Sequence, residues 1–65
     1  MRIFVNGDQR DVAPRTLALA LEELGYGGKK IATAVNGRFV AAVRRPDTNL
    51  ADGDRIEVVA PMQGG

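Results

Sequence analysis

The chain has 65 residues, with nine Lys and Arg against eight Asp and Glu and a formal net charge of +1. A chain of this length holds one domain with a small core. The near-neutral charge argues against nucleic acid as the main partner, because phosphate-binding domains usually carry a clear basic excess. The sequence has no Cys, His, Ser or Trp, which removes thiolate metal sites and the common base-activated nucleophiles. We therefore expect no bound metal or cofactor, and any chemistry must be supplied by another protein.

The apolar runs are too short for a membrane span. Residues 1–6 also lack the long apolar region of a signal peptide. We therefore expect the chain to lie in the cytoplasm and to have no membrane partner.

The first elements are predicted to form a hairpin. Residues 2–6 alternate in polarity, which is typical of a strand with one buried face. Asn6-Gly7 is a strong signal for a tight turn. The returning strand is then expected over residues 9–13.

A helix follows the hairpin. Pro14 ends the strand, and Thr16 can accept a hydrogen bond as the N-cap of a helix that begins at Leu17. Residues 17–24 are strong helix formers, and Gly25 is placed to end the helix. Its leucines are expected to lie in the core.

The middle of the chain predicts further strands. Residues 26–30 form a loop that only weakly resembles a phosphate-binding turn. Residues 31–35 are apolar and short, which predicts a strand buried on both faces. Asn36-Gly37 then turns the chain into a strand over residues 38–40. The pattern over residues 41–49 does not decide between structures.

The chain ends in a strand and a tail. Asp52-Gly53-Asp54 is interpreted as a turn, because the spaced ligands and closing Glu of a calcium loop are missing. Residues 55–59 alternate as a strand, and Pro61 must end its hydrogen-bond ladder. A terminal diglycine, Gly64-Gly65, would then place a carboxylate on a thin stalk that fits a narrow channel.

The run over residues 50–59, with a short spacer and Gly64-Gly65, resembles the ThiS family of sulfur carrier proteins of thiamine biosynthesis. Residues 32–40 are similar to that family's central strand and turn. The resemblance implies a single α+β domain over residues 1–65, with residues 60–65 as a flexible tail. The implied fold is the ubiquitin-like β-grasp, a mixed four- to five-stranded sheet packed on one main helix, with the first and last strands as central neighbours.

The resemblance also implies a function. A ThiF-like adenylyltransferase would use ATP to activate the carboxylate of Gly65, and a sulfur donor such as a cysteine desulfurase would convert it to a thiocarboxylate. The thiocarboxylate would then pass sulfur to thiazole synthase, ThiG. In this interpretation Gly64 gives clearance in the channel. The residues expected to contact partners are Pro61, Met62, Gln63, Val59 and Phe4.

Three alternatives stay open. Similar motifs occur in MoaD-like carriers of molybdopterin synthesis or of another sulfur pathway. A ubiquitin-like modifier would join Gly65 to lysines of target proteins through the same activated carboxylate. A passive or RNA-binding β-grasp module would not use the tail, and the near-neutral charge disfavours RNA binding.

Overall fold

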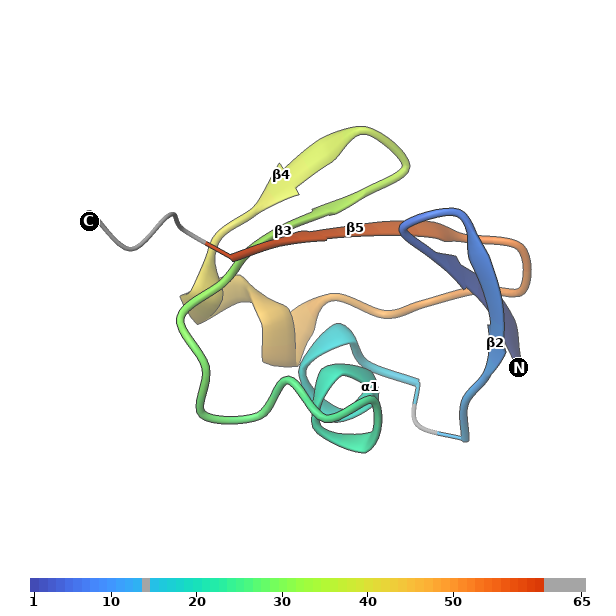
Figure 1. The fold of residues 1–65 in the computed structure, drawn as a ribbon, viewed down its shortest axis with the longest axis horizontal. Coiled ribbons are helices and arrows are strands. Elements are labelled where there is room, and N and C mark those ends of the chain that lie inside the picture. Colours follow the sequence, from blue (N-terminus) through green and yellow to red (C-terminus); the bar gives the residue numbers. More distant parts are fainter. Residues whose placement is uncertain (14, 61–65) are drawn as a thin grey trace.

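A computed structural model describes residues 1–13 and 15–60 of the chain. Five strands and one α-helix form in the described residues, together with one short 3₁₀ helix (Figure 1). The elements are β1 Arg2–Val5, β2 Asp8–Asp11, α1 Leu17–Glu23, β3 Ala32–Val35, β4 Arg38–Val40, η1 Ala42–Asp47 and β5 Arg55–Val59. The predicted order of hairpin, helix, further strands and final strand is confirmed. Residues 41–49, which the sequence pattern left undecided, contain η1. The second strand is two residues shorter at its end than predicted.

The strands form one mixed sheet in the order β2-β1-β5-β3-β4. Only the pairing of β1 with β5 is parallel within this sheet; the other neighbours are antiparallel. The first and last strands are neighbours, as predicted, and β5 lies at the centre. The chain therefore continues into residues 60–65 from the middle of the sheet.

Two tight turns close the hairpins. Asn6 and Asn36 have φ angles of 50° and 51°, and the glycines that follow them, Gly7 and Gly37, have φ angles of 87° and 83°. Positive φ at both central residues is the geometry that Asn-Gly tolerates best and that matches the twist of paired strands. The hairpins predicted at these two dipeptides are therefore confirmed.

The helix α1 is closed at both ends by local hydrogen bonds. The hydroxyl of Thr16 accepts a bond of 3.3 Å from the amide of Leu19. At the other end, the amide of Tyr26 donates to the carbonyl of Leu21 at 2.8 Å, and Gly25 has a φ of 95°. This is a Schellman ending, which satisfies carbonyls that the helix itself leaves free.

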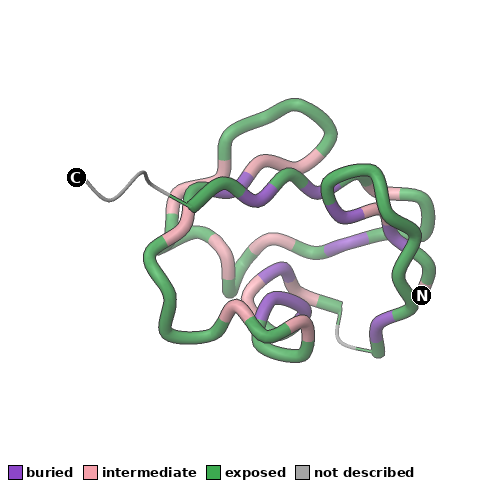
Figure 2. The backbone as a smooth tube through the Cα atoms, viewed as in Figure 1, coloured by how far each residue is buried: buried purple, intermediate pink, exposed green. Residues whose placement is uncertain are grey.

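The core lies between α1 and one face of the sheet (Figures 1 and 2). Its buried apolar residues come from β1, β5, α1 and two connections: Ile3, Val5, Val12, Leu17, Ala20, Leu21, Leu50, Ile56 and Val58. The expectation that the helical leucines all lie in the core was wrong for Leu19, which is 52% exposed. It is on the face of α1 that points away from the sheet, since Leu17 and Leu21 point inward.

The prediction that the third strand is buried on both faces was also wrong. In β3 only Thr33 is buried, and Ala32 is exposed. The reason is that α1 covers one face of the sheet and no described element covers the other (Figure 1). The small apolar residues of β3 therefore line an open surface.

Thr33 joins β3 to the two elements that follow it. Its hydroxyl donates to the carbonyl of Val40 at 2.9 Å and accepts from Nε of Arg45 at 3.0 Å. The Nη2 group of Arg45 also donates to the carbonyl of Ile31 at 2.7 Å. The side chain of Arg45 therefore connects η1 to the beginning of β3.

The turn before β5 is held by its aspartates. The Asp52 carboxylate accepts a bond of 2.8 Å from the amide of Arg2. The two oxygens of Asp54 accept from the amide of Ala51 at 2.8 Å and from the side-chain amide of Asn36 at 3.0 Å. Both carboxylates thus hold the turn that was predicted here. Residues 1–13 and 15–60 contain no group of three acidic, His or Cys side chains that could hold a metal ion.

Candidate functional site at the end of the central strand

The tail that the sequence singled out begins where β5 ends. Val59 is the last residue of β5, and Ala60 after it is exposed. The predicted site residues Pro61, Met62, Gln63, Gly64 and Gly65 lie outside the described residues. The described part of the site therefore consists of the end of β5, the uncovered face of the sheet and a groove beside Val59.

The end of β5 is held on both sides. On the side of β3, Val59 pairs with Ala32 and Val58 pairs with Thr33. On the side of β1, the backbone turns away after Val5, but Asn6 continues the pairing with its side chain. Its Oδ1 accepts from the amide of Val58 at 2.9 Å, and its Nδ2 donates to the carbonyl of Val58 at 3.1 Å. The last residues of β5 before Ala60 are consequently held in place from both neighbouring sides.

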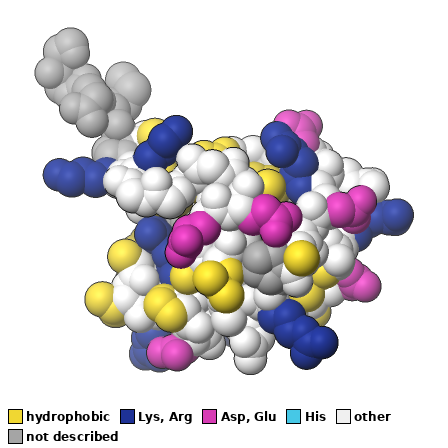
Figure 3. Space-filling view, turned by 90° about the horizontal axis from the view of Figure 1, so that it is seen from below, with side chains coloured by type: hydrophobic (Ala, Val, Ile, Leu, Met, Phe, Trp, Pro, Cys, Tyr) yellow, Lys and Arg dark blue, Asp and Glu magenta, His cyan; other side chains and the backbone are white. Residues whose placement is uncertain are grey.

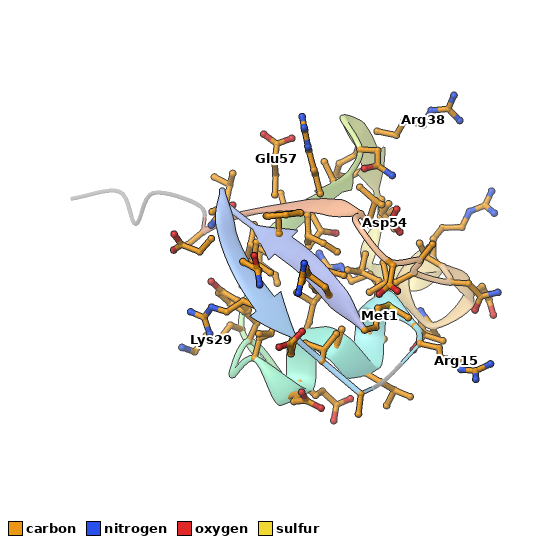
Figure 4. The ribbon with its side chains drawn as sticks, turned by 90° about the vertical axis from the view of Figure 1, so that its right-hand side faces the viewer. Met1, Arg15, Lys29, Arg38, Asp54 and Glu57 are labelled. Carbon is orange, nitrogen blue, oxygen red and sulfur yellow. The ribbon has the colours of Figure 1, made fainter. Side chains whose placement is uncertain are left out.

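The uncovered face of the sheet carries the two remaining predicted contact residues. Phe4 pairs with Arg55, and both point to this face together with Glu57 and Val59. Figure 4 shows Glu57 projecting from β5 on the side away from α1. Phe4 and Val59 therefore lie on the same face of adjacent strands. Arg55, which pairs with Phe4, is four positions before Val59, so the two apolar residues are offset by about 13 Å along the strand.

Sequence reasoning missed a third apolar residue on this face. Phe39 is 73% exposed and pairs with Ala34, which itself pairs with Glu57. It lines a small hollow with Glu57 and Val59. The signal was available in the register of the hairpin, because a residue opposite Ala34 must share its face.

A second hollow also borders Val59. It is a groove of about 450 Å³ between the loop before β3, the beginning of β3 and η1. Its lining residues are Lys29, Lys30, Ile31, Ala32, Ala42, Arg45 and Val59. Figure 3 shows Lys and Arg side chains on either side of the place where the described part of the chain ends.

The described residues place an apolar face and two hollows around the end of β5. His and Cys are absent from the chain, and no helix in the described part of the chain is long and apolar enough to cross a membrane. The arrangement is a central strand that is hydrogen-bonded on both sides up to Val58 and is followed by residues 60–65.

Comparison with known proteins agrees with this arrangement. A family model described as the ThiS family matches residues 3–65. The chain is 41% identical over 63 residues to a protein named sulfur carrier protein ThiS from Thermus thermophilus, covering 97% of this chain and 98% of that one. It is also 33% identical over 66 residues to a thiazole synthase from Paramagnetospirillum magneticum, of which this match spans only 20%.

The fold is that of a solved relative. The crystal structure of the thiamine biosynthesis protein ThiS from Geobacter metallireducens superimposes with a TM-score of 0.83 at 25% identity, over 100% of both chains. A solution structure of the protein from the same organism gives a TM-score of 0.77, over 100% of this chain and 88% of that one. The mixed sheet with its single α-helix is therefore the predicted ubiquitin-like β-grasp.

Proposed function

The chain belongs to the ThiS family and is a homologue of the sulfur carrier protein ThiS, and from this premise we propose that it carries sulfur on the carboxylate of Gly65. One observation supports the proposal most. The central strand is held up to Val59 by β3 and up to Val58 by Asn6, and it leads directly into the segment that ends in Gly64-Gly65.

The proposed chemistry needs no nucleophile from the chain. A carboxylate is a poor electrophile, so ATP first converts it to an acyl-adenylate with release of pyrophosphate. The persulfide of a sulfur donor then attacks the acyl carbon and AMP leaves, which gives an acyl disulfide. A thiol then attacks the donor's own sulfur, which forms a disulfide with the donor and releases the thiocarboxylate. The sulfur is nucleophilic without any cysteine, which fits a chain that has none. In this role the protein is a co-substrate that is consumed and regenerated and is not a catalyst.

The proposed partners follow from the steps. They are a ThiF-like adenylyltransferase that binds ATP, a sulfur donor such as a cysteine desulfurase, and the thiazole synthase ThiG that receives the sulfur. Support for ThiG comes from the thiazole synthase relative, whose similar region makes up a fifth of its length. We place the reaction in the cytoplasm, where ATP is available to the activating enzyme.

The residues have distinct proposed roles. Gly64 leaves clearance in the channel of the enzyme, and Pro61, Met62 and Gln63 contact the mouth of that channel. The apolar residues of the uncovered face, Phe4 and Val59, contact the body of a partner. We add Phe39 to this contact surface because its ring is exposed beside Val59.

Deletion of Gly65 tests the proposal. The shortened chain is expected to lose sulfur loading by the activating enzyme, ATP and donor, while its thermal unfolding midpoint stays unchanged. Substitution Gly65→Ala keeps both the length of the tail and a terminal carboxylate at position 65. It therefore tests whether loading requires glycine itself at this position. Loading that survives the deletion would reject the proposal, and a ladder of conjugates on a denaturing gel would indicate a protein modifier instead.

A further inference from the structure

The groove beside the end of β5 concentrates positive charge. Three of its lining residues are cations and none is acidic, although the whole chain has nearly equal numbers of basic and acidic residues. The other lining residues are apolar: Ile31, Ala32, Ala42 and Val59. The groove therefore combines an apolar floor with a basic rim.

One of the cations is fixed and two are free to adapt. The guanidinium of Arg45 is half-buried and donates to Thr33 and to the carbonyl of Ile31. Lys29 and Lys30 are exposed on the loop that enters β3. Replacement of the two lysines should therefore leave the fold intact, since neither belongs to the buried core.

The position of the groove next to the tail indicates which partner binds over it. Val59 lines the groove and is followed at once by Ala60 and the tail. An enzyme whose channel mouth contacts Pro61, Met62 and Gln63 must bring the surface around that mouth close to Val59, which lies only two residues before Pro61. Covering cations without opposite charges is unfavourable, whereas covering the apolar floor is favourable. A fitting partner surface therefore carries carboxylates around an apolar contact.

We propose that this basic groove is the docking site for an acidic segment of the enzyme that adenylates the tail, an inference that rests on the function proposed above. The carboxylates of that segment pair with Lys29 and Lys30, and an apolar side chain between them packs on Ala32 and Val59. The pairing steers association and aligns the tail with the channel, and it takes no part in the chemical step.

Charge reversal with a matched control tests the proposal. The double variant Lys29→Glu/Lys30→Glu is compared with Arg10→Glu/Arg15→Glu, which makes the same change in net charge at two exposed residues that do not line the groove. Binding to the purified ThiF-like enzyme is measured by calorimetry, and adenylation is measured by pyrophosphate release at low and high salt. Thermal unfolding confirms that both variants fold.

The groove variant is expected to raise the Kd and the KM for the carrier about tenfold or more, the range for rim charges that steer association. Its kcat and its KM for ATP are expected to stay unchanged, as are all constants of the control variant. The wild-type KM should rise with salt and that of the groove variant should rise less.

The outcomes separate the two claims. If the wild type is adenylated and the groove and control variants have the same KM for the carrier, the docking proposal alone is overturned. A change in the groove variant that is confined to kcat or to the KM for ATP also overturns it, because it would indicate that the lysines contact the nucleotide. A charge effect on binding without adenylation of the wild type overturns the proposed function alone. Absence of both binding and adenylation overturns both.

Discussion

The side-chain amide of Asn6 takes the place of a peptide group beside Val58. It donates a hydrogen bond to the carbonyl of Val58 and accepts one from the amide of Val58. The two residues are 52 positions apart in the chain. The amide of Asn6 itself donates to the carbonyl of Ile56 at 2.9 Å, so the side chain adds the next step of the parallel ladder after the backbone has turned away. The same residue therefore closes the first hairpin and holds the end of the central strand.

Substitution Asn6→Gly tests this double role. Glycine accepts the positive φ of the turn, so the hairpin should survive while the two bonds to Val58 are lost. We expect the free energy of unfolding to fall by about 1–2 kcal/mol, because each exposed or half-buried bond contributes roughly 0.5–1.5 kcal/mol. Urea denaturation gives this value, and hydrogen exchange at the Val58 amide should become faster. Unchanged stability together with unchanged exchange would contradict the account.

The contact of Thr33 with Arg45 predicts an energetic coupling. Thr33 is 2% exposed, and its hydroxyl satisfies two partners. Thr33→Val should cost about 1–3 kcal/mol, since it leaves the carbonyl of Val40 without its donor. In a double-mutant cycle with Arg45→Ala, the two effects should fall short of additivity by about 0.5 kcal/mol or more. Additive losses of stability in urea titrations would show that the two side chains act independently.

The turn before β5 should depend on Asp54 and not on a metal. Asp54→Ala removes acceptors from Ala51 and Asn36, and we expect it to lower the free energy of unfolding by about 1–2 kcal/mol. Asp47→Ala, at an exposed position of η1, is the matched control and should change stability by less than about 0.5 kcal/mol. Addition of calcium should leave the unfolding midpoint of the wild type unchanged, and a calcium-dependent rise would contradict the interpretation of this turn.

Phe39 should matter for partners and not for the fold. Because its ring is largely exposed, Phe39→Ser is expected to change the free energy of unfolding by less than about 0.5 kcal/mol. The same change should raise the KM for the carrier in the adenylation reaction. The exposed Leu19 on α1 lies on the opposite side of the molecule, so Leu19→Ser is the matched control. Equal effects of the two substitutions on KM would remove Phe39 from the contact surface.

Local signals were sufficient for the strands and for α1, although not for η1. The Asn-Gly dipeptides predicted both hairpins, because few residues tolerate the required positive φ. Thr16 and Gly25 predicted the limits of α1, because both act through nearby backbone groups. The neighbouring positions of the first and last strands came from the family resemblance and are confirmed by the sheet order.

Features that depend on distant parts of the chain were missed. The exposure of Ala32 could not be read from an apolar run, because it depends on α1 covering only one face of the sheet. The bonds of Asn6 to Val58 and of Arg45 to Thr33 join residues whose proximity only the folded chain creates. The basic groove was missed for the same reason, since Lys30, Arg45 and Val59 come together from three separate segments.

The most direct test of the carrier function is the intact mass of the protein after incubation with its activating enzyme, ATP and a sulfur donor. We expect a mass gain equal to the replacement of one oxygen by sulfur, which disappears on hydrolysis and is absent when Gly65 is deleted. A mass that stays unchanged while the same enzyme forms AMP with the wild-type chain would contradict the proposal that Gly65 carries sulfur.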